Sequence, residues 1–195
     1  MNIMVVGIGG QGVMTASEVL ARAALAHGLD ACKTEVAGMS QRGGVVSSQL
    51  RIGAQVLACD IPPGQVELLI ALEAAEALRW GHCLAGDGWV LANTLRVEPP
   101  VVSAGLQRYP ADPWGELQAT RRRARRIDAG AVAAGLGDRR LANTVMLGAA
   151  ADLLPLPAHT LLQQVLERFG ANETLRSRNA AAFAAGRELA GLPVP

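Results

Sequence analysis

The sequence has little of what usually marks a nucleic-acid or membrane protein. Lys33 is its only lysine, aromatic residues make up 3% of the chain, and the formal net charge is +1. General binders of nucleic acids or membrane surfaces normally carry a strong excess of basic residues. No apolar run approaches the roughly 20 residues that cross a bilayer, and the first residues lack the pattern of a secretory signal. We therefore expect a cytoplasmic protein that binds neither nucleic acid nor membrane.

Metal-binding and redox-active patterns are also missing. The cysteines and histidines are scattered, without a C-x-x-C pair or histidines at ligand spacing. We expect the thiols to be buried and the histidines to be structural or surface residues. The chain is therefore expected to supply no metal ligand and no catalytic residue. The residues in question are Cys32, Cys59, Cys83, His27, His82 and His159.

The composition favours a compact α/β domain. Half of the residues are hydrophobic, and because few are aromatic, the core has to be built from valine, leucine, isoleucine and alanine. A length of 195 residues suits one domain, and no repeat or linker divides the chain. We expect a single domain over residues 1–195 with a three-layer, Rossmann-like open sheet. The sheet should be mostly parallel with some antiparallel strands, and the C-terminal part helical.

The most informative features are two glycine-rich segments near the N-terminus. The first, Gly7 to Gly12, follows a strand-like run at 3–6 and precedes a helical pattern at 13–27. Its G-x-G-x-x-G spacing is typical of dinucleotide-binding turns, where the first N–H groups of the helix face an anion. That fold also needs an acidic residue at the end of the second strand to hold a ribose, and neither Asp30 nor Glu35 fits that place. A nicotinamide-dependent enzyme is therefore disfavoured.

The second segment, Gly38 to Gly44, follows an expected strand at 31–36 and contains Gln41, Arg42 and two consecutive glycines. The carboxyl ends of parallel strands meet at one edge of an open sheet. We therefore expect both segments to lie at the same edge, where they form a polar, anion-facing crevice or an interface.

Together the two segments resemble the beta subunit of indolepyruvate:ferredoxin oxidoreductase, which is similar to the gamma subunit or domain of other 2-oxoacid:acceptor oxidoreductases. The likeness rests on the first glycine turn and on the Q-R-G-G motif within the signature at 35–45. It continues through residues 67–73, 93–94, 143–148 and 179–186, and so covers essentially the whole chain.

The resemblance implies a subunit of a thiamine diphosphate-dependent complex. Such a complex decarboxylates an arylpyruvate such as indolepyruvate oxidatively, forms the acyl-CoA and passes electrons to ferredoxin. Thiamine diphosphate, Mg and the 4Fe-4S clusters are then expected in the partner alpha subunit, so that this chain binds no cofactor firmly and is inactive alone. The alternatives are a complex that acts on another 2-oxoacid, and a subunit that binds no ligand and serves only for interaction.

The candidate site residues all lie in the two glycine-rich segments. Either they contact coenzyme A, with its diphosphate bound by backbone N–H groups and Arg42, or they only allow close packing of strand, helix and partner. The candidates are Gly7, Gly9, Gly10, Gln11, Gly12, Gln41, Arg42, Gly43 and Gly44.

Other patterns have competing interpretations. Gly86-Asp87-Gly88 resembles the opening of a thiamine diphosphate motif, but no asparagine pair follows at the right distance, so we expect a turn before a strand. The arginine-rich run at 121–126 is a docking site for an acidic or phosphate-bearing partner or, more simply, a solvated helix face or loop. The irregular stretch at 105–113 is a candidate lid or interface loop.

Periodicity and turn signals predict the remaining elements. A third strand at 45–51 is expected to return through a hairpin at 52–54 to another strand at 55–58. Further strands are expected at 66–72, 89–92 and within 127–133, an extended segment at 97–102, and helices at 73–79, 143–153, 159–169 and 174–189.

Overall fold

A computed structural model describes residues 1–37, 44–98, 100–103, 105–106, 108–120 and 123–192. A six-stranded sheet runs through the molecule in the order β2-β3-β1-β4-β5-β6. Its strands are β1 (Asn2–Ile8), β2 (Asp30–Ala37), β3 (Val45–Gly53), β4 (Val66–Ala71), β5 (Leu84–Asn93) and β6 (Ala124–Ile127).

The direction of the strands sets where their ends meet. β1, β4, β5 and β6 are parallel, whereas β3 is antiparallel to both β1 and β2. β2 is therefore parallel to β1 but separated from it by β3. The carboxyl ends of the five parallel strands lie at one edge of the sheet, which we call the carboxyl edge. The expected open sheet, mostly parallel with an antiparallel strand, is confirmed.

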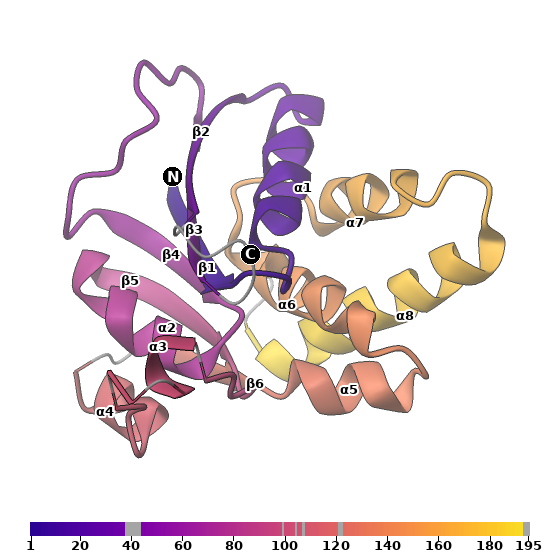
Figure 1. Cartoon of the computed structure of the whole chain (residues 1–195). Helices are drawn as coiled ribbons and strands as arrows, with labels where there is room; N and C mark the ends of the chain where they lie inside the picture. Colours follow the sequence, from indigo (N-terminus) through magenta and orange to yellow (C-terminus); the bar gives the residue numbers. More distant parts are fainter. Residues whose placement is uncertain (38–43, 99, 104, 107, 121–122, 193–195) are drawn as a thin grey trace.

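Helices cover both faces of the sheet and make three layers (Figure 1). One face packs against α1 (Val13–Ala26), α5 (Ala129–Gly135), α6 (Ala142–Ala150), α7 (Ala158–Glu167) and α8 (Glu173–Ala190). The other packs against α2 (Ala74–Trp80) and α4 (Pro113–Thr120). Phe183 is the one aromatic residue among the buried apolar side chains of the described chain, so the core is aliphatic as expected.

Two of the C-terminal helices, α6 and α8, pack very closely against each other. A Cβ atom at Gly148 would lie 2.1 Å from the carbonyl oxygen of Phe183, and one at Gly186 would lie 2.0 Å from that of Val145. The two helices therefore touch backbone to backbone. All three C-terminal helices were predicted, although the first ends in a short 3₁₀ turn, Ala151–Leu153.

The expected last strand within 127–133 is wrong. β6 ends at Ile127, and Asp128 caps α5 by accepting a hydrogen bond of 3.0 Å from the N–H of Ala131. The predicted exposure of the arginine run is confirmed for Arg125 and Arg126, but they lie on β6, an edge strand, and not on a helix or loop. Charged side chains on an edge strand discourage pairing with another chain.

The glycine-aspartate-glycine sequence at 86–88 does not form a turn. It lies inside β5, where the pairing with β4 shifts register between Val66 and Leu68. A Cβ atom at Gly88 would lie 2.7 Å from the carbonyl oxygen of Val66, so the shift needs a residue without a side chain. This is the amino end of β5, opposite the carboxyl edge.

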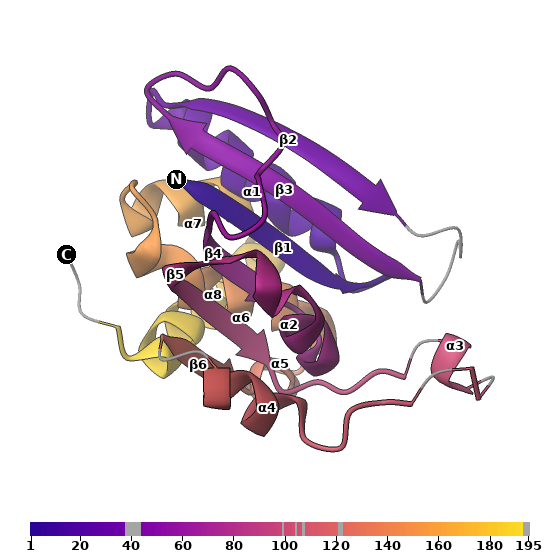
Figure 2. The ribbon, with the colours of Figure 1, turned by 90° about the vertical axis from the view of Figure 1, so that its left-hand side faces the viewer.

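The expected hairpin at 52–54 is wrong, because β3 already pairs with β1 on one side and β2 on the other. Residues 54–65 instead form a loop that crosses the sheet at the end opposite the carboxyl edge (Figures 1 and 2). Arg51 donates to the carbonyl oxygens of Ala58 and Asp60 at 3.1 and 3.4 Å. The N–H of Val56 donates to the Asp30 carboxylate at 2.9 Å.

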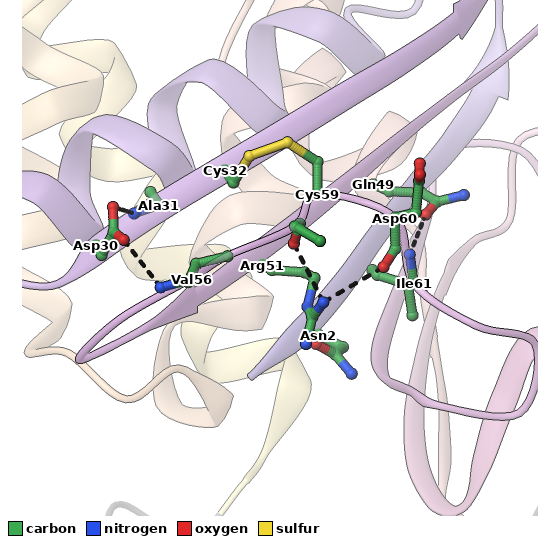
Figure 3. Close-up of a disulfide and its surroundings, with 11 residues drawn as sticks. Asn2, Asp30, Ala31, Cys32, Gln49, Arg51, Val56, Cys59, Asp60 and Ile61 are labelled. Atoms are coloured by element: carbon green, nitrogen blue, oxygen red, sulfur yellow. Dashed lines mark hydrogen bonds between the residues drawn. A yellow bond between two sulfur atoms is a disulfide. The ribbon is translucent and has the colours of Figure 1, made fainter.

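The same loop is joined to β2 by a disulfide between Cys32 and Cys59 (Figure 3). The expectation of buried thiols is therefore wrong for these two residues. They lie 27 positions apart, and only the return of the loop over the sheet brings them together. Cys83 has a free thiol, and burial raises its pKa.

Two further observations concern the part of the chain that the structure describes. None of its helices is both long and apolar enough to cross a membrane. The three histidines are exposed, which confirms that they are surface residues. The expected extended segment at 97–102 is wrong at its end, where the short helix α3 (Pro100–Ser103) begins. This helix lies well away from the sheet, beyond the carboxyl edge (Figure 2).

Candidate functional site

The first glycine-rich segment connects β1 to α1 at the carboxyl edge. Gly10 and Gly12 have φ angles of 99° and 83°, in the left-handed region that favours glycine. A Cβ atom at Gly7 would lie 2.6 Å from Oε1 of Gln11. That oxygen accepts a hydrogen bond of 2.7 Å from the N–H of Ile8 and closes the turn. The predicted turn between a strand and a helix is confirmed.

Asn143, at the start of α6, holds this turn from the other side. Its Nδ2 donates to the carbonyl oxygens of Gln11 and Gly12 at 3.2 and 3.0 Å. Local sequence patterns do not predict this contact, because the partners lie more than 130 positions apart. The first turn is thus fixed by its own glutamine and by a distant asparagine.

The second glycine-rich segment lies mostly outside the described residues, which include Gly44 but not Gln41, Arg42 or Gly43. The carbonyl oxygen of Gly44 accepts a hydrogen bond of 2.8 Å from the N–H of Gly9. The two segments therefore meet at the carboxyl edge, as expected from the sequence. The strand next to β1 is β3, which is antiparallel to it. Gly44, directly before the start of β3, therefore makes the contact.

The same arrangement explains why no acidic residue is placed for a ribose. Glu35 lies on β2, which β3 separates from β1. Its carboxylate accepts a hydrogen bond of 2.9 Å from Lys33. Dinucleotide folds place this acid on the strand beside β1, and in this chain that strand is β3.

A crevice of about 390 Å³ opens at the carboxyl edge between β1 and β4. From β1 the chain crosses to β2 on one side, and from β4 it crosses to β5 on the other side. Such a reversal is the place where open α/β sheets bind ligands. Residues of the first turn, of the strand ends and of the start of α6 line the crevice, among them Gln11, Gly12, Leu72, Asn93, Arg139 and Asn143.

Two buried polar atoms in the lining of the crevice have no partner among the described residues. They are Nε2 of Gln11, a donor, and Oδ1 of Asn93, an acceptor. Asn93 is only 3% exposed, and its Nδ2 donates to the carbonyl oxygen of Leu72 at 3.2 Å. Because buried polar groups are nearly always hydrogen-bonded, these two atoms are candidates for hydrogen bonds to a ligand or to water.

Two arginines and a helix N-terminus border the crevice. Arg139 and Arg140 stand on a 3₁₀ turn beside it, and α1 begins there without an acidic residue in its first turn. Arg140 is paired with Asp138 at 2.7 Å, and its hydrogen bonds hold the pKa of that carboxyl at about 2. Arg139 has no ion-pair partner in the described part of the chain. The site therefore suits an anionic group.

A second polar cluster lies at the end of β4. Glu73 is 1% exposed and caps α2 by accepting a hydrogen bond of 3.0 Å from the N–H of Glu76. Its other oxygen accepts hydrogen bonds from the N–H of Val97 and from the hydroxyl of Tyr109. Burial of the phenol, and next its bond to Glu73, raises the pKa of Tyr109. The sequence did not predict this cluster, which joins segments up to 36 positions apart.

In the described ranges no group of three His, Cys, Asp or Glu side chains is arranged to bind an ion. What the carboxyl edge offers instead is a crevice with two unpartnered side-chain polar atoms and arginines at its rim.

These features define an open α/β domain with a crevice at the point where the strand order reverses, built around a glycine turn and a helix N-terminus. The family model described as pyruvate ferredoxin/flavodoxin oxidoreductase matches residues 2–189. The chain belongs to this family of 2-oxoacid oxidoreductase subunits, as its resemblance predicted.

Curated relatives support the assignment. The chain is 42% identical over 150 residues to indolepyruvate oxidoreductase subunit IorB of Archaeoglobus fulgidus, a match that covers 76% of this chain and 74% of the relative. It is 35% identical over 170 residues to the subunit of the same name from Methanothermobacter thermautotrophicus, covering 84% and 85%. The predicted enzyme class, a subunit of an oxidoreductase complex, is confirmed.

Solved structures show the same fold. Pyruvate oxidoreductase subunit PORC of Thermotoga maritima superposes with a TM-score of 0.74 at 21% identity, covering 97% of this chain and 96% of the other. The 2-oxoglutarate:ferredoxin oxidoreductase of Magnetococcus marinus, solved with 2-oxoglutarate, coenzyme A and succinyl-CoA, gives 0.77 at 20% identity, covering this whole chain but 32% of the other. At these identities the likeness concerns the fold alone.

Proposed function

We propose that the chain is the beta, gamma-type subunit of a thiamine diphosphate-dependent indolepyruvate:ferredoxin oxidoreductase. The observation that carries this proposal is the 42% identity to a subunit of an indolepyruvate oxidoreductase. In the reaction an arylpyruvate loses its carboxylate as carbon dioxide. The acyl group forms a thioester with coenzyme A, the thiol proton is released, and the electron pair reduces ferredoxin.

In this proposal the thiamine diphosphate, its Mg and the 4Fe-4S clusters belong to the partner alpha subunit. Thiamine diphosphate supplies stabilisation of the negative charge that decarboxylation leaves on carbon. The beta subunit acts as one domain over residues 1–195 and binds no cofactor firmly. A cytoplasmic location follows from the proposed acceptor, since ferredoxin is a soluble carrier.

The role proposed for the carboxyl edge is to bind coenzyme A. Its diphosphate suits the backbone N–H groups of the first glycine turn, the start of α1 and the guanidinium of Arg139. The pantetheine arm contains amides, each with one donor and one acceptor. Such an amide complements the unpartnered Nε2 of Gln11 and Oδ1 of Asn93. The segment at 41–44, with Arg42, would complete the site.

The alternative is a subunit that binds no ligand and serves only for assembly. The glycines of the first turn then only allow strand, helix and partner to pack closely. A complex acting on another 2-oxoacid is a second alternative, because the substrate would be selected mainly by the alpha subunit.

The first experiment measures reduction of ferredoxin or a viologen dye with indolepyruvate and coenzyme A. The chain, its alpha subunit and the mixture are assayed separately, and activity is expected only in the mixture. If the complex forms but is no more active than the alpha subunit alone, the chain is an interaction subunit. Comparing kcat/KM for indolepyruvate, pyruvate and 2-oxoglutarate in the mixture identifies the substrate.

The second experiment tests the crevice with Arg139→Ala and Arg42→Ala in the assembled complex. We expect the KM for coenzyme A to rise about tenfold, the effect of losing a charge-assisted contact, with kcat and assembly little changed. Arg22→Ala is the matched control, because Arg22 is exposed on α1 and forms an ion pair with Glu18 at 2.8 Å. An unchanged KM in both variants rules out the coenzyme A contact.

A further inference from the structure

Two of the few aromatic residues of the chain line a cavity that is separate from the crevice. The chain has one tyrosine, three tryptophans and two phenylalanines. Tyr109 and Trp114 both line a cavity of about 180 Å³ between the ends of β5 and β6 and the starts of α2 and α4. The sides of the cavity also include Thr94, Arg96 and Arg126. Scarce aromatic side chains at a half-open cavity, rather than in the core, point to a planar ligand.

The aromatic wall is held in place before any ligand arrives. Tyr109 donates its hydroxyl hydrogen bond to the buried carboxylate of Glu73, which also fixes the chain at Val97. The guanidinium of Arg96 stacks on the tyrosine ring, 4.1 Å from its centre. On the other side Trp114 packs against the core beneath α2 and α4. A wall that is already ordered loses little entropy on binding.

The charges around the cavity leave one positive charge uncompensated. Arg96 is paired with Glu98 at 3.2 Å. Arg126, on β6, has no ion-pair partner among the residues that the structure describes. A single free guanidinium matches a monoanion better than a phosphate dianion, and its planar fork matches a carboxylate.

The size of the cavity limits the ligand further. Sites for drug-sized molecules occupy about 300–1,000 Å³. A cavity of about 180 Å³ is too small for a nucleotide and suits one ring with a short side chain. We propose that this cavity is a binding site for an aromatic carboxylic acid, with the ring against Trp114 and Tyr109 and the carboxylate on Arg126.

This site is separate from the crevice. Asn93 and Thr94 stand between the two cavities at the end of β5, and Asn93 borders both. The aromatic-acid site needs no residue of the glycine turns. Its binding can therefore be measured on the chain alone, whatever the outcome for coenzyme A.

The test is calorimetric titration of the full chain with phenylacetate, which has the ring and the carboxylate but no keto group to react. We expect saturable binding at one site. Trp114→Leu and Arg126→Ala should each weaken it at least tenfold, and circular dichroism should show that both variants are folded. Phenylacetamide, which lacks the charge, and acetate, which lacks the ring, should bind at least tenfold more weakly than phenylacetate.

Arg125→Ala is the matched control. Arg125 is the neighbour of Arg126 on β6, but its guanidinium lies over Trp89, 5.5 Å from the ring centre, and Trp89 packs against the opposite core. Binding should be unchanged in this variant. The proposal is overturned if phenylacetate does not saturate, if Arg125→Ala weakens its binding as much as Arg126→Ala does, or if adenosine monophosphate binds more tightly.

Discussion

Single polar side chains organise the carboxyl edge, and most of them act on distant parts of the chain. Asn143 holds the first glycine turn from the start of α6, and Glu73 joins the start of α2 to Val97 and Tyr109. The turn itself could be predicted, because its glycines and Gln11 are local. The asparagine and the glutamate could not, since the spacing of a sequence does not show which distant carbonyl or hydroxyl a side chain will meet.

Tyr109 offers a prediction about pH. Its pKa is raised, so the folded state keeps the phenol proton more tightly than the unfolded state, whose value is near 10.0. The stability from this group is complete below pH 10 and is lost as the pH rises further. At neutral pH Tyr109→Phe should cost about 1 kcal/mol, the net value of one half-buried hydrogen bond.

Urea unfolding at several pH values measures this difference. The stability gap between the original chain and Tyr109→Phe should narrow above pH 10. Because Tyr109 is the only tyrosine, near-ultraviolet absorbance also reports its ionisation directly. Ionisation at the ordinary value in the folded chain would contradict the bond to Glu73.

The backbones of α6 and α8 lie so close together that no side chain fits between them at Gly148 or Gly186. Gly148→Ala or Gly186→Ala would place a methyl group within 2.1 Å of a carbonyl oxygen on the other helix. We expect each change to separate the helices and to cost about 3 kcal/mol or more. Chemical unfolding measures the loss. Gly135→Ala, at the end of α5 with open space around it, is the control and should be neutral; an equal loss there would show that the contact is not responsible.

The disulfide that joins the loop at 54–65 to β2 should stabilise the fold. It closes 27 positions of chain, a length for which the entropy model predicts about 3 to 4 kcal/mol of stabilisation. Cys32→Ser, or a reductant, should lower the free energy of unfolding by about this amount. Cys83→Ser should not change the response to reductant, since Cys83 is unpaired.

The loop should stay in place after reduction, because Arg51 and Asp30 also hold it by hydrogen bonds (Figure 3). Activity of the complex is therefore expected to survive reduction. Unchanged stability in Cys32→Ser would show that the disulfide does not form in solution.

The errors in the predicted elements have physical causes. The sequence after Ile127 was interpreted as a strand because it is apolar, but Asp128 is a helix cap and alanine favours a helix. The hairpin after Gly53 failed because β3 lies inside the sheet, and both its edges are occupied. Local patterns showed where strands and helices begin, but not which strands become neighbours.

On the scale of the whole molecule, four of the seven exposed large apolar side chains of the described residues lie at or beyond the carboxyl edge. Met14, Val36, Leu95 and Leu106 are 51%, 63%, 42% and 77% exposed. They lie at the start of α1, near the end of β2, after β5 and after α3. Exposed apolar groups around a polar crevice are typical of a surface that a partner covers.

We therefore predict that the alpha subunit binds at this edge. Val36→Asp and Leu106→Asp should weaken association at least tenfold, because a charge would be buried against the partner. Leu57→Asp is the control, since Leu57 is 88% exposed in the loop at 54–65. Analytical ultracentrifugation measures the affinity, and a loss confined to Leu57→Asp would place the interface at the opposite end of the sheet.

The position of β1 in the strand order also affects how the chain folds as it is synthesised. Of the six strands, β1 is synthesised first, yet its neighbours β3 and β4 begin only at Val45 and Val66. The hydrogen bonds of β1 to its neighbours therefore cannot form while only α1 and β2 have been synthesised. A nascent chain stalled before Val45 would expose an unpaired apolar strand, which is prone to aggregation. We expect holdase chaperones to bind this strand on the ribosome.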